Sequence, residues 1–179
     1  MTASSQKTLF LFITAGLLFA PASGEELATP SVGAQARSAS KEEVAVVVNL
    51  ANNVENLSKD ELRRIFLGER SHWPNGRRIT VVMMEPGQPE REAILHDVCH
   101  MSETNYNNHM LHGLFTGEVF ASPKTLAAPV GVRKFVFNVP GAIGYLRSIN
   151  LDHNVKVIKI DGHLPGDRQY TIKLESQSK

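Results

Sequence analysis

The sequence has a single cysteine, Cys99, so no internal disulfide can form and the fold must rest on its hydrophobic core. Aromatic residues make up only 7% of the chain, and no basic run is interleaved with them as single-strand nucleic-acid binding requires. Acidic and basic residues nearly cancel, at 18 against 19, so no strong field attracts nucleic acid or a membrane surface. The lack of a second cysteine excludes a scaffold held together by internal disulfides. The few aromatic residues and the balanced charge argue against a nucleic-acid-binding module.

Motifs that carry chemistry are also missing. No nucleophile elbow, HExxH helix, phosphate loop or GxGxxG pattern occurs, and no spacing of Ser, His and Asp singles out a triad. His96 and His100 have the i, i+4 spacing of zinc or copper ligands, and His109 and His112 follow. On a helical wheel, however, both pairs lie opposite their helix's apolar stripe, which predicts exposed histidines. We therefore expect no enzyme, cofactor or metal site, with a weak surface metal site at His96 and His100 as the alternative.

Only one long apolar run is present, Leu9–Ala20, preceded by Lys7 and followed by small residues. This anatomy predicts a secretory signal peptide at residues 1–24, because the run is shorter than the ~20 residues that span a bilayer. We expect its cleavage, no stable membrane span afterwards, and a periplasmic or secreted protein. Residues 25–42, rich in Ala, Ser and small polar residues, predict a disordered leader before a domain at 43–179.

Helices alternate with strands along this domain, which is typical of a layered α/β fold. The run 44–49 is apolar almost throughout and predicts a strand buried on both faces, a kind found in parallel sheets. At 57–68, Ser58 and Glu61 predict a capping box and Gly68 predicts the helix end. The pattern predicts further strands at 79–84, 142–146 and 168–174, an edge strand at 155–160, and helices at 89–101, at 102–115 and from Pro129.

Several side chains are expected in the core. Cys99 shares an apolar register with Ile94 and Val98, which predicts a buried, inert thiol rather than a reactive one. Trp73 is expected to fill an edge between the layers. The apolar side of the helix at 102–115 is expected to carry Tyr106, Met110, Leu111 and Leu114.

Several pieces of the sequence match one family in order. They are the strand and Asn-rich turn from residue 46, the pattern "LSKDELRRIFLG" with a downstream tryptophan, and "PGAIGYL" at 140–146. Together they resemble the phosphate-type substrate-binding proteins of bacterial ABC transporters, over residues 44–147. The resemblance implies an α/β layered mixed sheet with helices on both faces, like one lobe of a type 2 periplasmic binding protein. It also implies a small anion such as phosphate as ligand, and a transporter permease or envelope protein as partner.

The family holds phosphate on a Ser-Gly-Thr turn at a helix start. The corresponding stretch here, residues 85–92, has no hydroxyl group, and Pro89 lacks an N–H. The stretch still has a glycine turn, a helix start and an arginine, which together can bind an anion. The Asn-rich turn after the first strand can supply further contacts to the ligand. We therefore expect a ligand site made of Asn49, Asn52, Gly87, Gln88 and Arg91. The alternatives are an ordinary helix start stabilised by acids and an ordinary Asn-rich turn, hence an envelope accessory protein that has lost ligand binding.

Overall fold

A five-stranded mixed sheet forms the centre of the domain. The computed structural model describes residues 42–174, so the predicted signal peptide and all but the last residue of the predicted leader lie outside the described residues. In sheet order the strands are β4 (Lys124–Leu126), β3 (Thr80–Met84), β5 (Ala142–Arg147), β1 (Val44–Val48) and β6 (Lys156–Val157). β3, β4 and β5 are parallel to one another.

β1 corrects one expectation from the sequence. All five of its residues are buried, as predicted, but it runs antiparallel to both of its neighbours, β5 and β6. A fully apolar run satisfies burial on both faces whichever way the adjacent strands run, so the pattern predicts burial without fixing direction.

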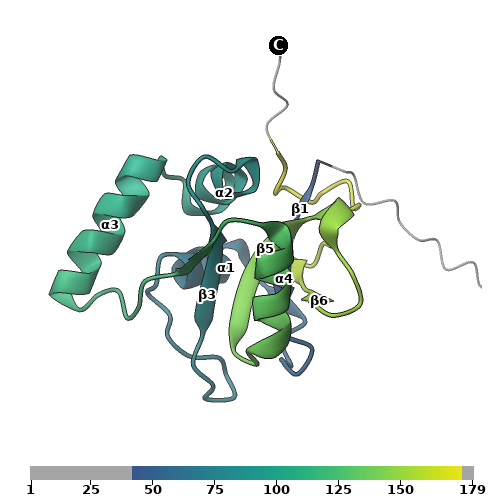
Figure 1. Ribbon diagram of the computed structural model, residues 1–179, viewed down its shortest axis with the longest axis horizontal. Helices are drawn as coiled ribbons and strands as arrows, with labels where there is room; N and C mark the ends of the chain where they lie inside the picture. The colour runs from purple at the N-terminus through teal and green to yellow at the C-terminus, as the bar shows by residue number, and fades with distance from the viewer. Residues whose placement is uncertain (1–41, 175–179) are drawn as a thin grey trace, which may run out of the picture. The chain divides into compact units, whose positions relative to one another are not determined.

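Helices cover both faces of the sheet, as expected (Figure 1). They are α1 (Lys59–Phe66), α2 (Pro89–Ile94), α3 (Glu103–Thr116) and α4 (Pro129–Asn138). In Figure 1, α4 lies in front of β5 and α1 lies behind the sheet. Within residues 42–174, no helix has the length and apolar character needed to cross a membrane.

The start of α1 follows the sequence prediction closely. The Ser58 hydroxyl accepts a hydrogen bond from the Glu61 N–H at 3.1 Å, and the Glu61 carboxylate accepts one from the Ser58 N–H at 3.0 Å. Leu62, Ile65 and Phe66 form the buried side of the helix. Gly68 follows the helix with φ at 75°, a left-handed conformation that glycine adopts without strain. The predicted capping box and stop are confirmed.

The helix predicted at 89–101 changes form halfway. α2 ends at Ile94, and the chain continues as a π-helical turn, η1 (Leu95–Cys99). His100 then adopts a left-handed conformation, with φ at 56°, which ends the segment before Met101. The predicted helix therefore does not run unbroken to Met101, and His100 caps the π-helical turn instead of lying within an α-helix.

The C-terminal strands also differ from the prediction. The single edge strand expected at 155–160 is divided between two sheets: β6 pairs with β1, whereas β7 (Lys159–Ile160) pairs in parallel with β2 (Asn56–Leu57). The strand expected at 168–174 is reduced to an isolated bridge between Glu43 and Lys173. Short alternating patterns predict extended backbone but not its pairing partner.

Helix α3 buries fewer residues than expected. Tyr106, Met110 and Gly113 are its buried residues. Leu111 and Leu114, predicted to face the core, are 59% and 41% exposed. Figure 1 shows α3 set to one side of the sheet, so only a narrow strip of the helix meets the rest of the domain.

The start of β5 lies very close to the start of β3. The Gly141 carbonyl accepts hydrogen bonds from the Thr80 N–H at 3.1 Å and from the indole N–H of Trp73 at 3.0 Å. Trp73 is buried, as expected for a core side chain, and its indole joins the loop before β3 to the backbone just before β5. A Cβ atom at Gly141 would lie only 2.1 Å from the Arg78 carbonyl oxygen, so any side chain there would force these two backbone segments apart.

We expect Gly141→Ala to destabilise the protein by at least about 2 kcal/mol, because the clash is with backbone that cannot rotate away. Gly131→Ala in α4 is the matched control: its Cβ would meet only Leu126 side-chain atoms at 3.8 Å, and alanine favours helix. Urea denaturation measures both variants. Equal stability of the two proteins would contradict this account of the junction.

Candidate functional site

The turn after β3 forms the first half of the predicted ligand site. β3 ends at Met84, and Gly87 turns the chain with φ at 83° in an exposed position. Gln88 is the N-cap residue of α2, but its side chain makes no capping hydrogen bond. Pro89 occupies the first helical position, where its missing N–H costs the helix nothing.

Arg91 lies beneath this turn rather than at its surface. It is 4% exposed, and its Nε and Nη2 atoms each donate to one oxygen of Glu103 at 2.8 Å. Its Nη1 atom donates to the Met84 carbonyl at 2.8 Å, and its guanidinium lies 5.5 Å from the centre of the Tyr106 ring. Burial acts to lower the pKa of Arg91, but the hydrogen bonds and charge of Glu103 outweigh it and raise the pKa above its usual value. All three nitrogens of the guanidinium therefore already have partners within the chain.

Glu90 places a carboxylate in the first turn of α2. It is 4% exposed and accepts a hydrogen bond from Arg147 Nε at 2.9 Å. Glu85 and Glu92, both exposed, flank the same segment. An anion approaching this turn would meet the two exposed carboxylates of Glu85 and Glu92, which oppose it electrostatically, whereas the charge of Glu90 is balanced by Arg147.

Asn49 and Asn52 form the second half of the predicted site. Asn49 Nδ2 donates to the carbonyls of Val136 and Phe137, at 2.8 and 2.6 Å, and its Oδ1 accepts from the Ala51 N–H at 2.9 Å. Asn52 Oδ1 accepts from the Val54 N–H at 3.0 Å. Its Nδ2 atom is buried and has no hydrogen-bond partner, so Asn52 keeps one unused donor.

The fold places the two halves of the predicted site at opposite ends of the strands. Because β1 is antiparallel to β5, its end at Val48 pairs with Ile143 near the start of β5. The turn at Gly87 instead follows the end of β3, which runs parallel to β5. Gly87, Gln88 and Arg91 are thus close in the chain and in space, whereas Asn49 and Asn52 are not brought to them.

Two of the histidines, His96 and His100, lie around an open hollow of about 490 Å³, whose lining also includes Glu92 and Glu103. His96 Nδ1 lies 2.9 Å from the Asp97 carboxylate, and His100 Nδ1 lies 3.1 Å from the His96 carbonyl. Both rings are exposed. Among residues 42–174, no cluster of three or more His, Cys, Asp or Glu has the geometry to hold a metal ion.

One histidine differs from the expectation. His109 was predicted to face water, but it is half-buried, with Nε2 3.2 Å from the Leu67 carbonyl that ends α1. This contact attaches α3 to α1, since helix C-terminal carbonyls need external donors.

Cys99 is a buried thiol, as predicted. Burial raises its pKa to about 12, and the nearby cations Arg63 and Arg91 only partly offset this effect. The thiolate, which is the nucleophilic form, is therefore scarce at neutral pH.

We expect native Cys99 to react with a thiol reagent such as DTNB at pH 8 at least about a hundredfold more slowly than the urea-unfolded chain. Asn75→Cys, in the exposed turn after Trp73, provides the control thiol and should react rapidly in the folded state. Rapid, stoichiometric labelling of Cys99 in the folded protein would contradict its assigned burial.

The sequence did not reveal the acids that neutralise the two arginines. Glu103 lies 12 residues after Arg91, and Glu90 lies 57 residues before Arg147. Neither separation has a recognisable periodicity. The only local signal was the position of Glu103 directly after the cap residue Ser102, where acids are common because they stabilise helix starts.

We expect Glu103→Ala to cost about 2 kcal/mol, because it leaves the Arg91 guanidinium buried without its two charged hydrogen bonds. Glu118→Ala is the control, since Glu118 is exposed and should change stability by less than about 0.5 kcal/mol. Urea denaturation at pH 7 measures both. A similar small effect at the two positions would show that the buried pair does not hold the turn in place.

A scan against protein-family models gives no match. Among curated proteins, the chain is similar to the phosphate-binding protein PstS of Bacillus subtilis, with 28% identity over 127 residues that cover 68% of this chain and 37% of PstS.

Among solved structures, the chain is similar to a phosphate ABC transporter substrate-binding protein from Clostridium perfringens with bound phosphate (TM-score 0.57, 20% identity). The similarity covers 69% of this chain and 47% of that protein. An ABC-type phosphate transport receptor from Vibrio cholerae gives a TM-score of 0.53 at 21% identity, over 69% of this chain and 48% of the receptor. PstS from Borrelia burgdorferi gives a TM-score of 0.58 at 13% identity, over 74% of this chain and 55% of that PstS. The chain thus spans between 37% and 55% of the length of these proteins and shares their fold over that part.

Proposed function

We propose that this chain, which has the fold of one lobe of the phosphate-type substrate-binding proteins, is an exported, non-catalytic binding protein for a small oxyanion such as phosphate. The observation that carries the proposal is the shared fold, together with a curated relative described as phosphate-binding and a solved relative that holds phosphate. A transporter permease or another envelope protein is the proposed partner. Export rests on the predicted signal peptide, which lies outside the described residues.

The turn after β3 is the proposed contact for the anion. Gln88 has a side-chain amide that makes no hydrogen bond within residues 42–174, and Gly87 leaves the backbone accessible. Arg91 has a positioning role in this proposal: its bond to the Met84 carbonyl fixes the end of β3, from which the turn starts. Asn49 and Asn52, at the opposite end of the strands, are predicted contacts as well.

The proposed affinity is low. Only a turn and one amide are available, and Glu85, Glu90 and Glu92 lie nearby. The lobe formed by residues 42–174 contacts an anion on one side only. We expect a dissociation constant for phosphate on the order of 1 mM, which corresponds to a few kcal/mol of binding free energy.

Isothermal titration with inorganic phosphate, at constant ionic strength, tests this proposal. Gln88→Glu should weaken binding more than about tenfold, because it places a further carboxylate beside the anion. Gln169→Glu, an equal charge change at an exposed position near the C-terminal end of the described chain, should leave the affinity within about twofold. No heat at tens of millimolar phosphate, or equal affinity of the Gln88→Glu and wild-type proteins, would overturn the assignment.

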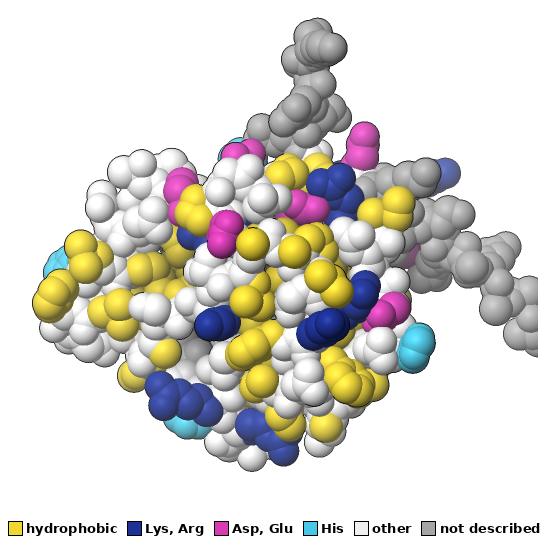
Figure 2. Space-filling model, viewed as in Figure 1, with side chains coloured by type: hydrophobic (Ala, Val, Ile, Leu, Met, Phe, Trp, Pro, Cys, Tyr) yellow, Lys and Arg dark blue, Asp and Glu magenta, His cyan; other side chains and the backbone are white. Residues whose placement is uncertain are grey.

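A second candidate function is that of an envelope accessory protein that binds no anion. The closed ion pairs of Arg91 with Glu103 and of Arg147 with Glu90 favour it, since both cations near the turn are already neutralised. Exposed hydrophobic side chains on α3 also favour it: Figure 2 shows them gathered at one end of that helix, at the lower left of the view. Leu111, Leu114 and Phe115 are exposed there, with Phe115 at 85%. A silent phosphate titration of correctly folded protein would select this candidate over the first.

A further inference from the structure

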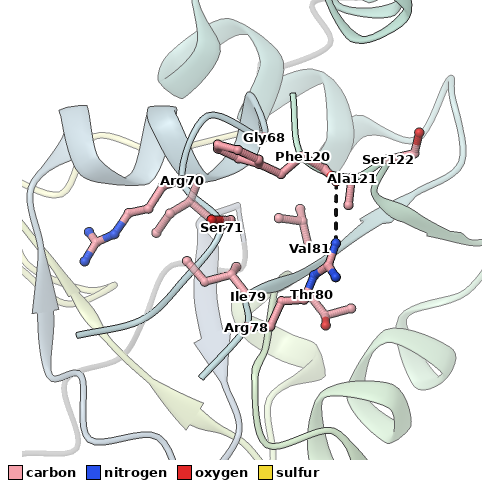
Figure 3. A pocket seen from close by; sticks show the side chains of 11 residues that line it. Gly68, Arg70, Ser71, Arg78, Ile79, Thr80, Val81, Phe120, Ala121 and Ser122 are labelled. Atoms are coloured by element: carbon pink, nitrogen blue, oxygen red, sulfur yellow. Dashed lines mark hydrogen bonds between the residues drawn. The ribbon is translucent and has the colours of Figure 1, made fainter. Parts of the chain in front are cut away.

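A cavity of about 240 Å³ lies at the edge of the sheet opposite the turn after β3. Its wall combines the start of β3, the end of α1 and the segment before β4 (Figure 3). Ile79, Thr80 and Val81 come from the first of these elements, and Phe120 and Ser122 come from the last. Because β3 and β4 are parallel, both elements approach the cavity at the beginning of a strand.

The charged lining of the cavity is entirely basic. Arg70 and Arg78 line it, and no Asp or Glu does. Arg70 Nη1 lies 3.2 Å from the Glu61 carboxylate, and Figure 3 shows its side chain directed away from that of Arg78. Arg78 is exposed, and within residues 42–174 the one hydrogen bond of its guanidinium is a long one of 3.5 Å to the Phe120 carbonyl. No carboxylate within residues 42–174 pairs with Arg78, so its guanidinium is available to an anion.

The rest of the lining is largely apolar, with hydroxyl groups among the apolar side chains. Ile65 and Ile79 are buried in the cavity wall, and the Phe120 side chain is 54% exposed. Figure 3 shows Arg78 reaching across toward Phe120, with Val81 and Ile79 beside it. The Thr80 hydroxyl makes no hydrogen bond within the described part of the chain. One side of the cavity therefore suits a negative group and the other suits hydrocarbon.

We propose that this cavity binds a small organic carboxylate that carries a short apolar or aromatic group. A guanidinium fork matches the two oxygens of a carboxylate, and the isoleucine and phenylalanine side chains accept the hydrocarbon part. A phosphate dianion fits less well, because one free cation does not balance its charge and apolar walls do not replace its hydration. The cavity lies at the start of β3, at the opposite end of that strand from the turn of Gly87 and Gln88, so the two assignments can be tested separately.

Benzoate is the probe, with benzamide as its uncharged analogue. We expect saturable amide shifts in ¹H–¹⁵N NMR spectra at Val81 and Ser122, with a dissociation constant on the order of 1 mM, and no comparable shifts with benzamide. Arg78→Met should weaken benzoate binding at least about tenfold, because the charged hydrogen bonds are lost. Arg77→Met is the matched control: Arg77 is the adjacent exposed cation, does not line the cavity, and should change the affinity less than about twofold.

Three outcomes would overturn the proposal. Equal binding of benzamide would show that the charge is not recognised, and equal losses in the Arg77 and Arg78 variants would show a non-specific field effect. Displacement of benzoate by an equal concentration of inorganic phosphate would show that the apolar walls contribute nothing. Gln88→Glu should leave benzoate binding unchanged, so a failure here is distinguishable from a failure of the phosphate assignment. Circular dichroism of Arg78→Met confirms that a lost signal does not come from unfolding.

Discussion

The absence of a side chain at Gly141 is the constraint on which the central sheet depends. Its carbonyl receives both the first ladder bond from Thr80 and the indole N–H of Trp73. The Arg78 carbonyl approaches so closely that no Cβ fits between the two segments. The contact sets the register of β3 against β5 and holds the loop before β3 under the tryptophan.

The two ends of β3 differ in chemistry, because different loops and helices lie at each end of the strand. At the end of β3, acids outnumber accessible cations, and Arg91 and Arg147 are both held in ion pairs. At its start, Arg78 stands without an acidic partner among residues 42–174, beside apolar side chains. A fold shared with anion-binding proteins therefore does not by itself decide where an anion meets this chain. The placement of individual charges decides it.

The features of the fold that could be predicted from the sequence are those set by neighbouring residues. The capping box of Ser58 and Glu61, the glycine stop at Gly68 and the buried run of β1 each depend on a few adjacent positions. The direction of β1, the division of 155–160 between two sheets and the exposure of Leu111 depend on tertiary packing, which leaves no local pattern.

The candidate site was less predictable than the fold. Gly87, Gln88 and Arg91 lie close together in space because they are near in sequence, but the partner of Arg91 could not be found from spacing. Asn49 and Asn52 were joined to them on the assumption that strand ends meet at one edge. That assumption holds for parallel strands and fails once β1 is reversed.

The outermost strands of the sheet are its shortest. β4 has three residues and follows a proline, β6 has two, and each includes a lysine. Each edge strand therefore presents few unpaired N–H and C=O groups to which a strand of a second molecule could bind, and a positive charge lies beside them. Self-association through strand addition is thus disfavoured by the architecture itself.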